Sequence, residues 1–184
     1  MNLVERVKGI LLRPKSEWSV IEGEPGNAGY LFPNYVAIVA AIPAVCSFIG
    51  ASLFGVDGYR VGVGVGLASA IVLYVLSLIG VFILAYIIDF LAGTFGARKS
   101  PENAMRISAY TPTAAWAAGV FNIIPVLSFL GILGLYSFYL LYTGIAALMR
   151  PPAEKTLLYT IAAIVCAIIV WLVIFGLVRL LFGM

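Results

Sequence analysis

The sequence predicts an all-α polytopic membrane protein, a bundle of five transmembrane helices preceded by a short amphipathic N-terminal helix. Of its 184 residues, 63% are hydrophobic and 10% are charged, which exceeds the apolar content that one soluble core of this length buries. Long uncharged stretches alternate with short charged ones. At about 20 residues per span, the length allows roughly four to six spans and no sizeable soluble domain.

The first segment, 1–29, is expected to be cytoplasmic and amphipathic, and it lacks the continuous apolar run of a signal peptide. On a helix from Asn2 to Leu12 the apolar residues share one arc, with Glu5, Arg6 and Lys8 outside it. Pro14 ends this helix, and a second short helical turn follows. We expect an interfacial helix, or alternatively an arm packed on the protein's own helices. Its candidate contact residues are Leu3, Val7, Ile10, Leu11 and Trp18.

The rest of the chain, 30–184, is predicted to form the transmembrane domain. One uncharged stretch, 107–149, spans about 64 Å as a helix, which fits two crossings of a bilayer core joined by a turn. Asn122 and Pro125 mark that turn. The alternative has four full spans and a re-entrant segment at 107–129. The predicted spans lie near 31–54, 65–88, 107–121, 127–149 and 157–181.

The distribution of basic residues predicts the orientation in a plasma or inner cell membrane. With the N-terminus inside, the outer side keeps only Arg60 and Arg179, while nine basic residues collect inside. Five spans then place the C-terminus outside. The nine inner residues are Arg6, Lys8, Arg13, Lys15, Arg98, Lys99, Arg106, Arg150 and Lys155.

The composition argues against an enzyme. The chain has no histidine, which removes histidine-based acid–base and metal chemistry, and its two aspartates cannot supply a multi-aspartate metal site. Cys46 and Cys166 lie inside apolar runs, where cysteine usually packs as a small hydrophobe. We therefore expect no catalytic residue, no metal and no cofactor, and no nucleic-acid partner because a basic domain is missing.

One group of polar residues inside the apolar runs is a candidate functional cluster. Asp89 is costly to bury unless it is paired, and Arg106 is its expected partner, in a structural ion pair or in a transport path. Pro112 breaks a helical hydrogen bond within the polar third span, which either lines a cavity or simply packs. The cluster comprises Asp89, Arg106, Ser108, Tyr110, Thr111, Pro112 and Asn122.

Gly62, Gly66 and Ala70 recur at every fourth residue near the start of the second span. Small residues at this spacing let another helix approach closely. They are a candidate packing face, either within the chain or between two copies of it.

Several short motifs resemble prokaryotic members of the Yip family, the Ypt-interacting proteins. They are Arg13-Pro14 followed by Trp18 and Ile21, the run from Ser108 to Pro112, Ile124-Pro125, and Tyr136 to Tyr139 ahead of Gly144. The resemblance covers nearly the whole chain and implies a helical, five-span membrane protein with a cytoplasmic N-terminal segment. It also implies a structural role for Tyr110 and Pro112. Eukaryotic relatives bind Rab-type GTPases in vesicle traffic, but their Asp-Leu-Tyr-Gly-Pro motif is absent from this sequence.

The leading hypothesis is a non-enzymatic membrane protein that organises membrane lipids or partner proteins, with a trafficking or membrane-shaping role. Its partner would be membrane lipid, another membrane protein or a second copy of itself. The rival hypothesis is a small transporter, channel or lipid-moving protein whose polar path follows the third span, with Asp89 as its charged element.

Overall fold

The computed structural model describes residues 2–55 and 60–182, and within these ranges every regular element is a helix. The N-terminal part contains α1 (Leu3–Leu12) and α2 (Pro14–Glu22). A first long leg follows, made of α3 (Ala28–Leu31), η1 (Phe32–Val36), α4 (Ala37–Ile49) and η2 (Gly50–Phe54). Next come α5 (Val63–Thr94), then α6 (Pro101–Tyr110), α7 (Thr113–Ala118) and η3 (Gly119–Ile123). The chain returns through η4 (Pro125–Leu135), α8 (Tyr136–Gly144) and η5 (Ile145–Met149), and ends with α9 (Ala153–Phe182).

Four helical stretches are long and apolar enough to cross a membrane. They are Ala28–Phe54, Val63–Thr94, Pro125–Met149 and Ala153–Ile174, and they overlap four of the five predicted spans. The predicted span at 107–121 falls on α6, α7 and η3, where the helix is interrupted at Thr111 and Pro112. Proline has no N–H to donate and its ring clashes with the preceding turn, so the helix breaks there. The protein is thus a multi-pass helical protein with four candidate spans, and the fifth crossing stays a prediction.

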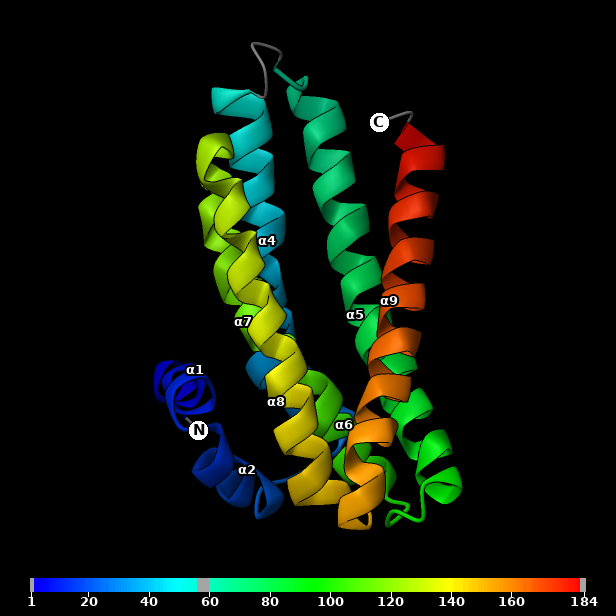
Figure 1. Ribbon diagram of the computed structural model, residues 1–184. Helices are drawn as coiled ribbons and strands as arrows, with labels where there is room; N and C mark the ends of the chain where they lie inside the picture. Colours follow the sequence, from blue (N-terminus) through cyan, green and yellow to red (C-terminus); the bar gives the residue numbers. More distant parts are fainter. Residues whose placement is uncertain (1, 56–59, 183–184) are drawn as a thin grey trace.

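The long helices run roughly parallel, and α1 lies across them (Figure 1). In that view α5 and α9 lie side by side, α4 and α7 form the opposite flank, and α1 is seen end-on. The leg made of α6, α7 and η3 rises from the lower end, and η4, α8 and η5 descend again. The C-terminal end of α9 lies at the upper end, away from α1 and α2. The side chain of Arg179, counted on the outer side above, falls outside the described residues.

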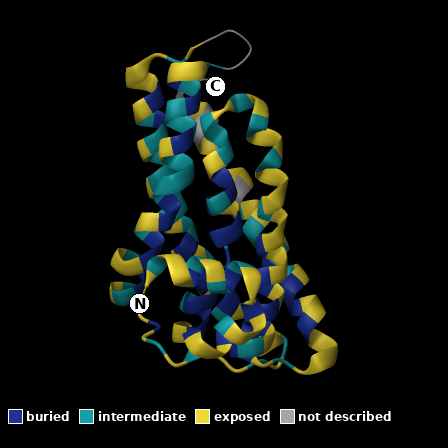
Figure 2. Ribbon diagram, turned by 90° about the vertical axis from the view of Figure 1, so that its left-hand side faces the viewer, coloured by how far each residue is buried: buried dark blue, intermediate teal, exposed yellow. Residues whose placement is uncertain are grey.

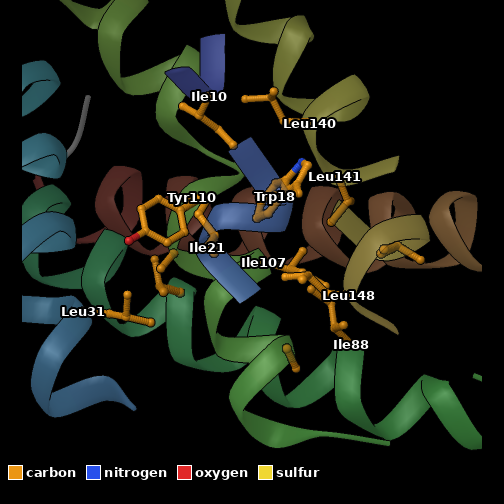
Figure 3. Close-up of a cluster of buried hydrophobic side chains, with 14 of the residues drawn as sticks. Ile10, Trp18, Ile21, Leu31, Ile88, Ile107, Tyr110, Leu140, Leu141 and Leu148 are labelled. Atoms are coloured by element: carbon orange, nitrogen blue, oxygen red, sulfur yellow. The ribbon is translucent and has the colours of Figure 1, made fainter. Parts of the chain in front are cut away.

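The buried core is concentrated in the lower half of the molecule (Figure 2). Its largest fully buried side chains include Trp18, Tyr35, Tyr110 and Tyr159. Figure 3 shows residues of α1 and α2 meeting residues of α6, α8 and η5 in this cluster. By contrast, η4 contains no buried residue, although it belongs to a candidate span. The N-terminal helices are therefore part of the core, while the outer faces of the upper half are apolar and exposed, as lipid-facing helices are.

Two glycines let α4 and the leg from α7 to η3 approach closely. A Cβ added at Gly119 would lie 2.5 Å from the Pro43 Cβ, and one added at Gly50 would lie 2.0 Å from the Asn122 carbonyl oxygen. Real Cβ atoms do not come this close to other heavy atoms, so both positions require glycine. This contact fixes the Asn122 turn against the first long leg.

We expect Gly119→Ala to destabilise the protein by about 1–3 kcal/mol, because the added methyl overpacks against a rigid proline ring. The matched control is Gly131→Ala, where a Cβ would meet nothing within 4 Å. Alanine at an open helical position is neutral or mildly stabilising. Thermal unfolding of both variants in detergent measures the difference, and equal midpoints would show that the close approach is wrong.

Candidate functional site

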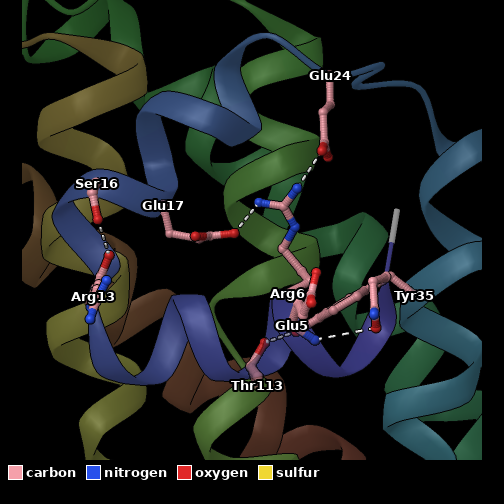
Figure 4. A network of polar contacts seen from close by, with 9 residues as sticks. Glu5, Arg6, Arg13, Ser16, Glu17, Glu24, Tyr35 and Thr113 are labelled. Carbon is pink, nitrogen blue, oxygen red and sulfur yellow. Dashed lines mark hydrogen bonds and ion pairs between the residues drawn. The ribbon is translucent and has the colours of Figure 1, made fainter.

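A buried arginine organises the lower end of the molecule. Arg6 of α1 is only 5% exposed, and its guanidinium forms ion pairs with Glu17 of α2 and with Glu24 beyond it (Figure 4). Its Cζ also lies 5.8 Å from the ring centroid of Tyr110, within cation–π range. A buried cation is tolerated only when such partners compensate for its lost hydration. Arg6 therefore ties α1, α2 and α6 together.

Local sequence features shape the turn that brings these charges together. Asn2 caps α1 by accepting hydrogen bonds from the backbone N–H groups of Val4 and Glu5. Pro14 stands at the first position of α2, where its missing N–H costs nothing. A Cβ at Gly9 would lie 2.3 Å from the Glu17 carboxylate, so the glycine leaves room for this carboxylate where it pairs with Arg6. Arg6 lies outside the apolar arc of α1, and its side chain is nevertheless buried against the protein.

Trp18 of α2 packs on α8 and forms a hydrogen bond with it. Its Nε1 donates a 3.0 Å hydrogen bond to the Thr143 hydroxyl, and its ring meets the Tyr110 ring edge-on at 6.4 Å between centroids. A Cβ at Gly144 would lie 2.8 Å from the Trp18 ring, so the glycine makes room for the indole. Trp18 is fully buried within the protein.

The other candidate interfacial residues also face the protein. Ile10 is fully buried, while Leu3, Val7 and Leu11 are partly buried against the core. On this side of α1, their positions agree with the alternative in which the N-terminal arm packs on the protein's own helices. The opposite side of the helix is exposed.

A second network joins the first long leg to the proline break. The Tyr35 and Thr113 hydroxyls are 2.8 Å apart, and the Thr113 hydroxyl donates to the Tyr110 carbonyl. The Tyr35 and Tyr110 rings lie 4.5 Å apart between centroids. All three residues are buried. This network holds the two sides of the break at Thr111 and Pro112 in register with η1.

The expected ion pair between Asp89 and Arg106 is not formed. The Arg106 Nε donates to the Glu24 carbonyl at 3.1 Å, and its guanidinium also binds Asn103. A Cβ at Gly26 would lie 2.7 Å from the Arg106 Cζ, so the loop after α2 packs directly on this side chain. The Tyr159 hydroxyl of α9, close to Asp89, donates to the Ile88 carbonyl. Asp89 and Arg106 face different neighbours, and the Asp89 Oδ1 is buried without a hydrogen-bond partner among the described residues.

The remaining members of the predicted polar cluster bond to different parts of the protein. The Ser108 hydroxyl donates to the Val81 carbonyl of α5, and the Asn122 amide donates to the Ser47 hydroxyl at 3.1 Å. The Thr111 hydroxyl is buried and has no partner in the described part of the chain. The structure thus brings Arg106 and Tyr110 near the Arg6 cluster but places Asp89 and Asn122 elsewhere.

The predicted small-residue face is used partly within the chain. A Cβ at Gly66 would lie 2.6 Å from the Ser52 hydroxyl and 3.3 Å from the Phe48 ring. Gly62 has open space around it. Ala70 lines an apolar groove of about 320 Å³ between α4 and α5, together with Phe48 and Tyr74.

A smaller cavity of about 50 Å³ lies at the proline break. Ser77, Ser108, Pro112 and Trp116 line it, with apolar residues of α9 on the other side. Over the described residues, no group of three or more metal-ligating side chains occurs. The hydrogen bonds and charges described above hold helices together.

Several residues of this site were not predicted from the sequence. They are Glu17 and Glu24, which form ion pairs with Arg6, Thr143, which accepts a hydrogen bond from Trp18, and Tyr35, whose ring packs on the Tyr110 ring. One available signal was the position of Arg6, one residue before Val7 and four before Ile10 of the apolar arc, together with the glutamates of α2 and of the loop that follows it. Thr143 lies 125 residues from Trp18, and no local pattern links them.

Loss of the buried cation should destabilise the protein. We expect Arg6→Gln to lower the free energy of unfolding by about 2–3 kcal/mol, because two carboxylates then face each other without a cation. This loss of stability is smaller than for a fully buried ion pair, because the side chains of Glu17 and Glu24 are 19% and 26% exposed and water screens their charges.

Thermal unfolding in detergent measures this change against Lys8→Gln, which alters an exposed residue of the same helix. The control should move stability by less than about 0.5 kcal/mol. If both variants unfold at one temperature, the Arg6 cluster does not hold α1 and α2 in place.

Comparison with known proteins identifies a family and relatives of the chain. The family model of the Yip1 domain matches residues 8–174 of the chain. The chain is also 28% identical to Inner membrane protein YohC of Escherichia coli K12 over 189 residues, covering 98% of this chain and 97% of that protein. The protein of the same description from E. coli O6:H1 shows the same identity and coverage. No solved structure matches the chain.

Proposed function

Because the chain belongs to the Yip1 domain family of integral membrane proteins, we propose that it is a non-enzymatic organising protein of the cell membrane. It brings membrane lipids or membrane proteins together, in a trafficking or membrane-shaping role. The partner is another membrane protein or a second copy of the chain. GTPase binding is not part of the proposal, because the motif of the eukaryotic relatives is absent.

The observation that carries this proposal is the internal use of the polar side chains. Ser108, Thr113 and Asn122 each bond to a group on a neighbouring helix. Arg106 bonds to the loop after α2. Polar groups that are satisfied within the protein stabilise a fixed arrangement, whereas a transport path needs groups free to bind a solute. This use of the polar residues favours a scaffold.

The proposed topology has five crossings, with the N-terminus in the cytoplasm and the C-terminus outside. Two observations support it over a re-entrant segment at 107–129. The leg from α6 to η3 runs along the length of the bundle, and α1 and the C-terminal end of α9 lie toward opposite ends (Figure 1). The basic residues Arg98, Lys99 and Lys155 are exposed at the end where α1 and α2 pack, as the inner side requires.

The test is the intact mass of the assembly, taken from native membranes under mild conditions. We expect a defined homo-oligomer or a stoichiometric protein partner. Gly62→Leu, at an open position of the small-residue face, should reduce assembly if that face is the contact, while Gly131→Leu is the control at another open glycine. A monomer carrying only a bound solute would contradict the organising role.

A small transporter or channel is the second candidate, favoured by the cavity at Pro112 and by the unpartnered Asp89 Oδ1. In that case Asp89→Asn abolishes ion flux while the fold survives. We expect instead that Asp89→Asn leaves proton leak unchanged in vesicles loaded with a pH-sensitive dye. Stability should also change little, because the carboxylate has no ion pair to lose among the described residues. A leak that the wild type shows and the variant lacks would favour transport.

A further inference from the structure

The outward side of the two N-terminal helices combines exposed apolar and basic residues. On α1, Val4, Lys8 and Leu12 lie four residues apart on the side opposite Arg6 and Ile10, and Leu12 is 77% exposed. On α2 and at its start, Val20 is 54% exposed and Arg13 and Lys15 are exposed. Glu5 is the one acidic residue among the exposed residues of these two helices. We call this surface the outer face, made of Val4, Glu5, Lys8, Leu12, Arg13, Lys15 and Val20.

The depth of this surface follows from helix geometry. Val81, whose carbonyl binds Ser108, lies about 27 Å along α5 from its first residue, Val63. Tyr110 follows Ser108 by two residues, and Arg6 packs on the Tyr110 ring. The hydrocarbon core of a bilayer is about 30 Å thick. If α5 enters the core near Val63, Arg6 and the helix that carries it lie close to the opposite boundary of the core.

The direction of α1 fits that boundary. It lies across the long helices rather than along them, and is therefore parallel to the plane of a membrane that they cross (Figure 1). A helix in this position contacts headgroups with its basic side chains and the upper acyl chains with its apolar ones. The inner side faces the protein through Ile10 and Trp18, so only the outer face is available to lipid.

We propose that the outer face binds the anionic phospholipid headgroups of the inner leaflet. Lys8, Arg13 and Lys15 supply three positive charges against the one negative charge of Glu5, which is complementary to an anionic lipid surface. The apolar side chains of Leu12 and Val20 insert between the lipid headgroups. This inference rests on the proposed orientation and names lipid as a partner of the organising protein.

The test uses the full-length protein in vesicles of phosphatidylcholine with brominated phosphatidylglycerol or brominated phosphatidylcholine. A bimane label is attached at Leu12→Cys after Cys46→Ala and Cys166→Ala. We expect brominated lipid to quench the label, and phosphatidylglycerol to be enriched around it by about threefold or more over phosphatidylcholine. Lys8→Gln with Arg13→Gln and Lys15→Gln should remove the enrichment, as should high salt.

The matched control neutralises Arg98, Lys99 and Lys155, three exposed basic residues at the same end but outside the outer face. It should leave the enrichment unchanged. Quenching by aqueous iodide without quenching by brominated lipid would overturn the proposal, as would equal quenching by the two lipids or an equal loss in the control. The assembly mass is a separate readout, so an oligomer without lipid enrichment would remove this inference and leave the organising role in place.

Discussion

The arrangement of the lower half of the molecule depends on the compensation of one buried charge, the guanidinium of Arg6. Its ion pairs with Glu17 and Glu24 close the hairpin of α1 and α2, and its contact with Tyr110 places that hairpin on α6. Arg6 without its glutamates, or the glutamates without Arg6, would leave a poorly hydrated charge without an opposite charge beside it. The loop that supplies Glu24 also accepts from Arg106, so a second buried cation depends on the same turn.

Much of the fold could be predicted because its signals are long and local. Apolar stretches at 31–54, 65–88, 127–149 and 157–181 coincide with the four candidate spans, and the break at Pro112 follows from proline chemistry. The site could be predicted only in part. Arg106 and Tyr110 were named, but Arg106 was paired with the wrong residue, because single-sequence reasoning places side chains along one helix and not around its neighbours.

The sequence pattern also failed at Arg6 for an identifiable reason. A helical projection leaves Arg6 outside the apolar arc, where a charged residue is expected to be exposed, whereas two glutamates that follow 11 and 18 residues later make a buried position favourable. The role of the polar residues in the third predicted span also depends on neighbours that are distant in the sequence. The sequence leaves open whether Ser108 lines a cavity or packs, and in the structure it does both: its hydroxyl donates to the Val81 carbonyl of α5, and the residue lines the cavity at Pro112.

The contact between Trp18 and Thr143 has a consequence for the order of biogenesis. The two residues are 125 positions apart, so the indole has no partner hydroxyl until α8 has been synthesised and inserted. Both N-terminal helices are therefore synthesised before α8, and the packing of α2 on α8 is completed only after that helix is inserted. Until then the apolar side chains of α2, Trp18 among them, lack the cover that α8 supplies. The membrane surface is the nearest apolar environment for these side chains during that time, and completion of the bundle then transfers them from lipid to protein.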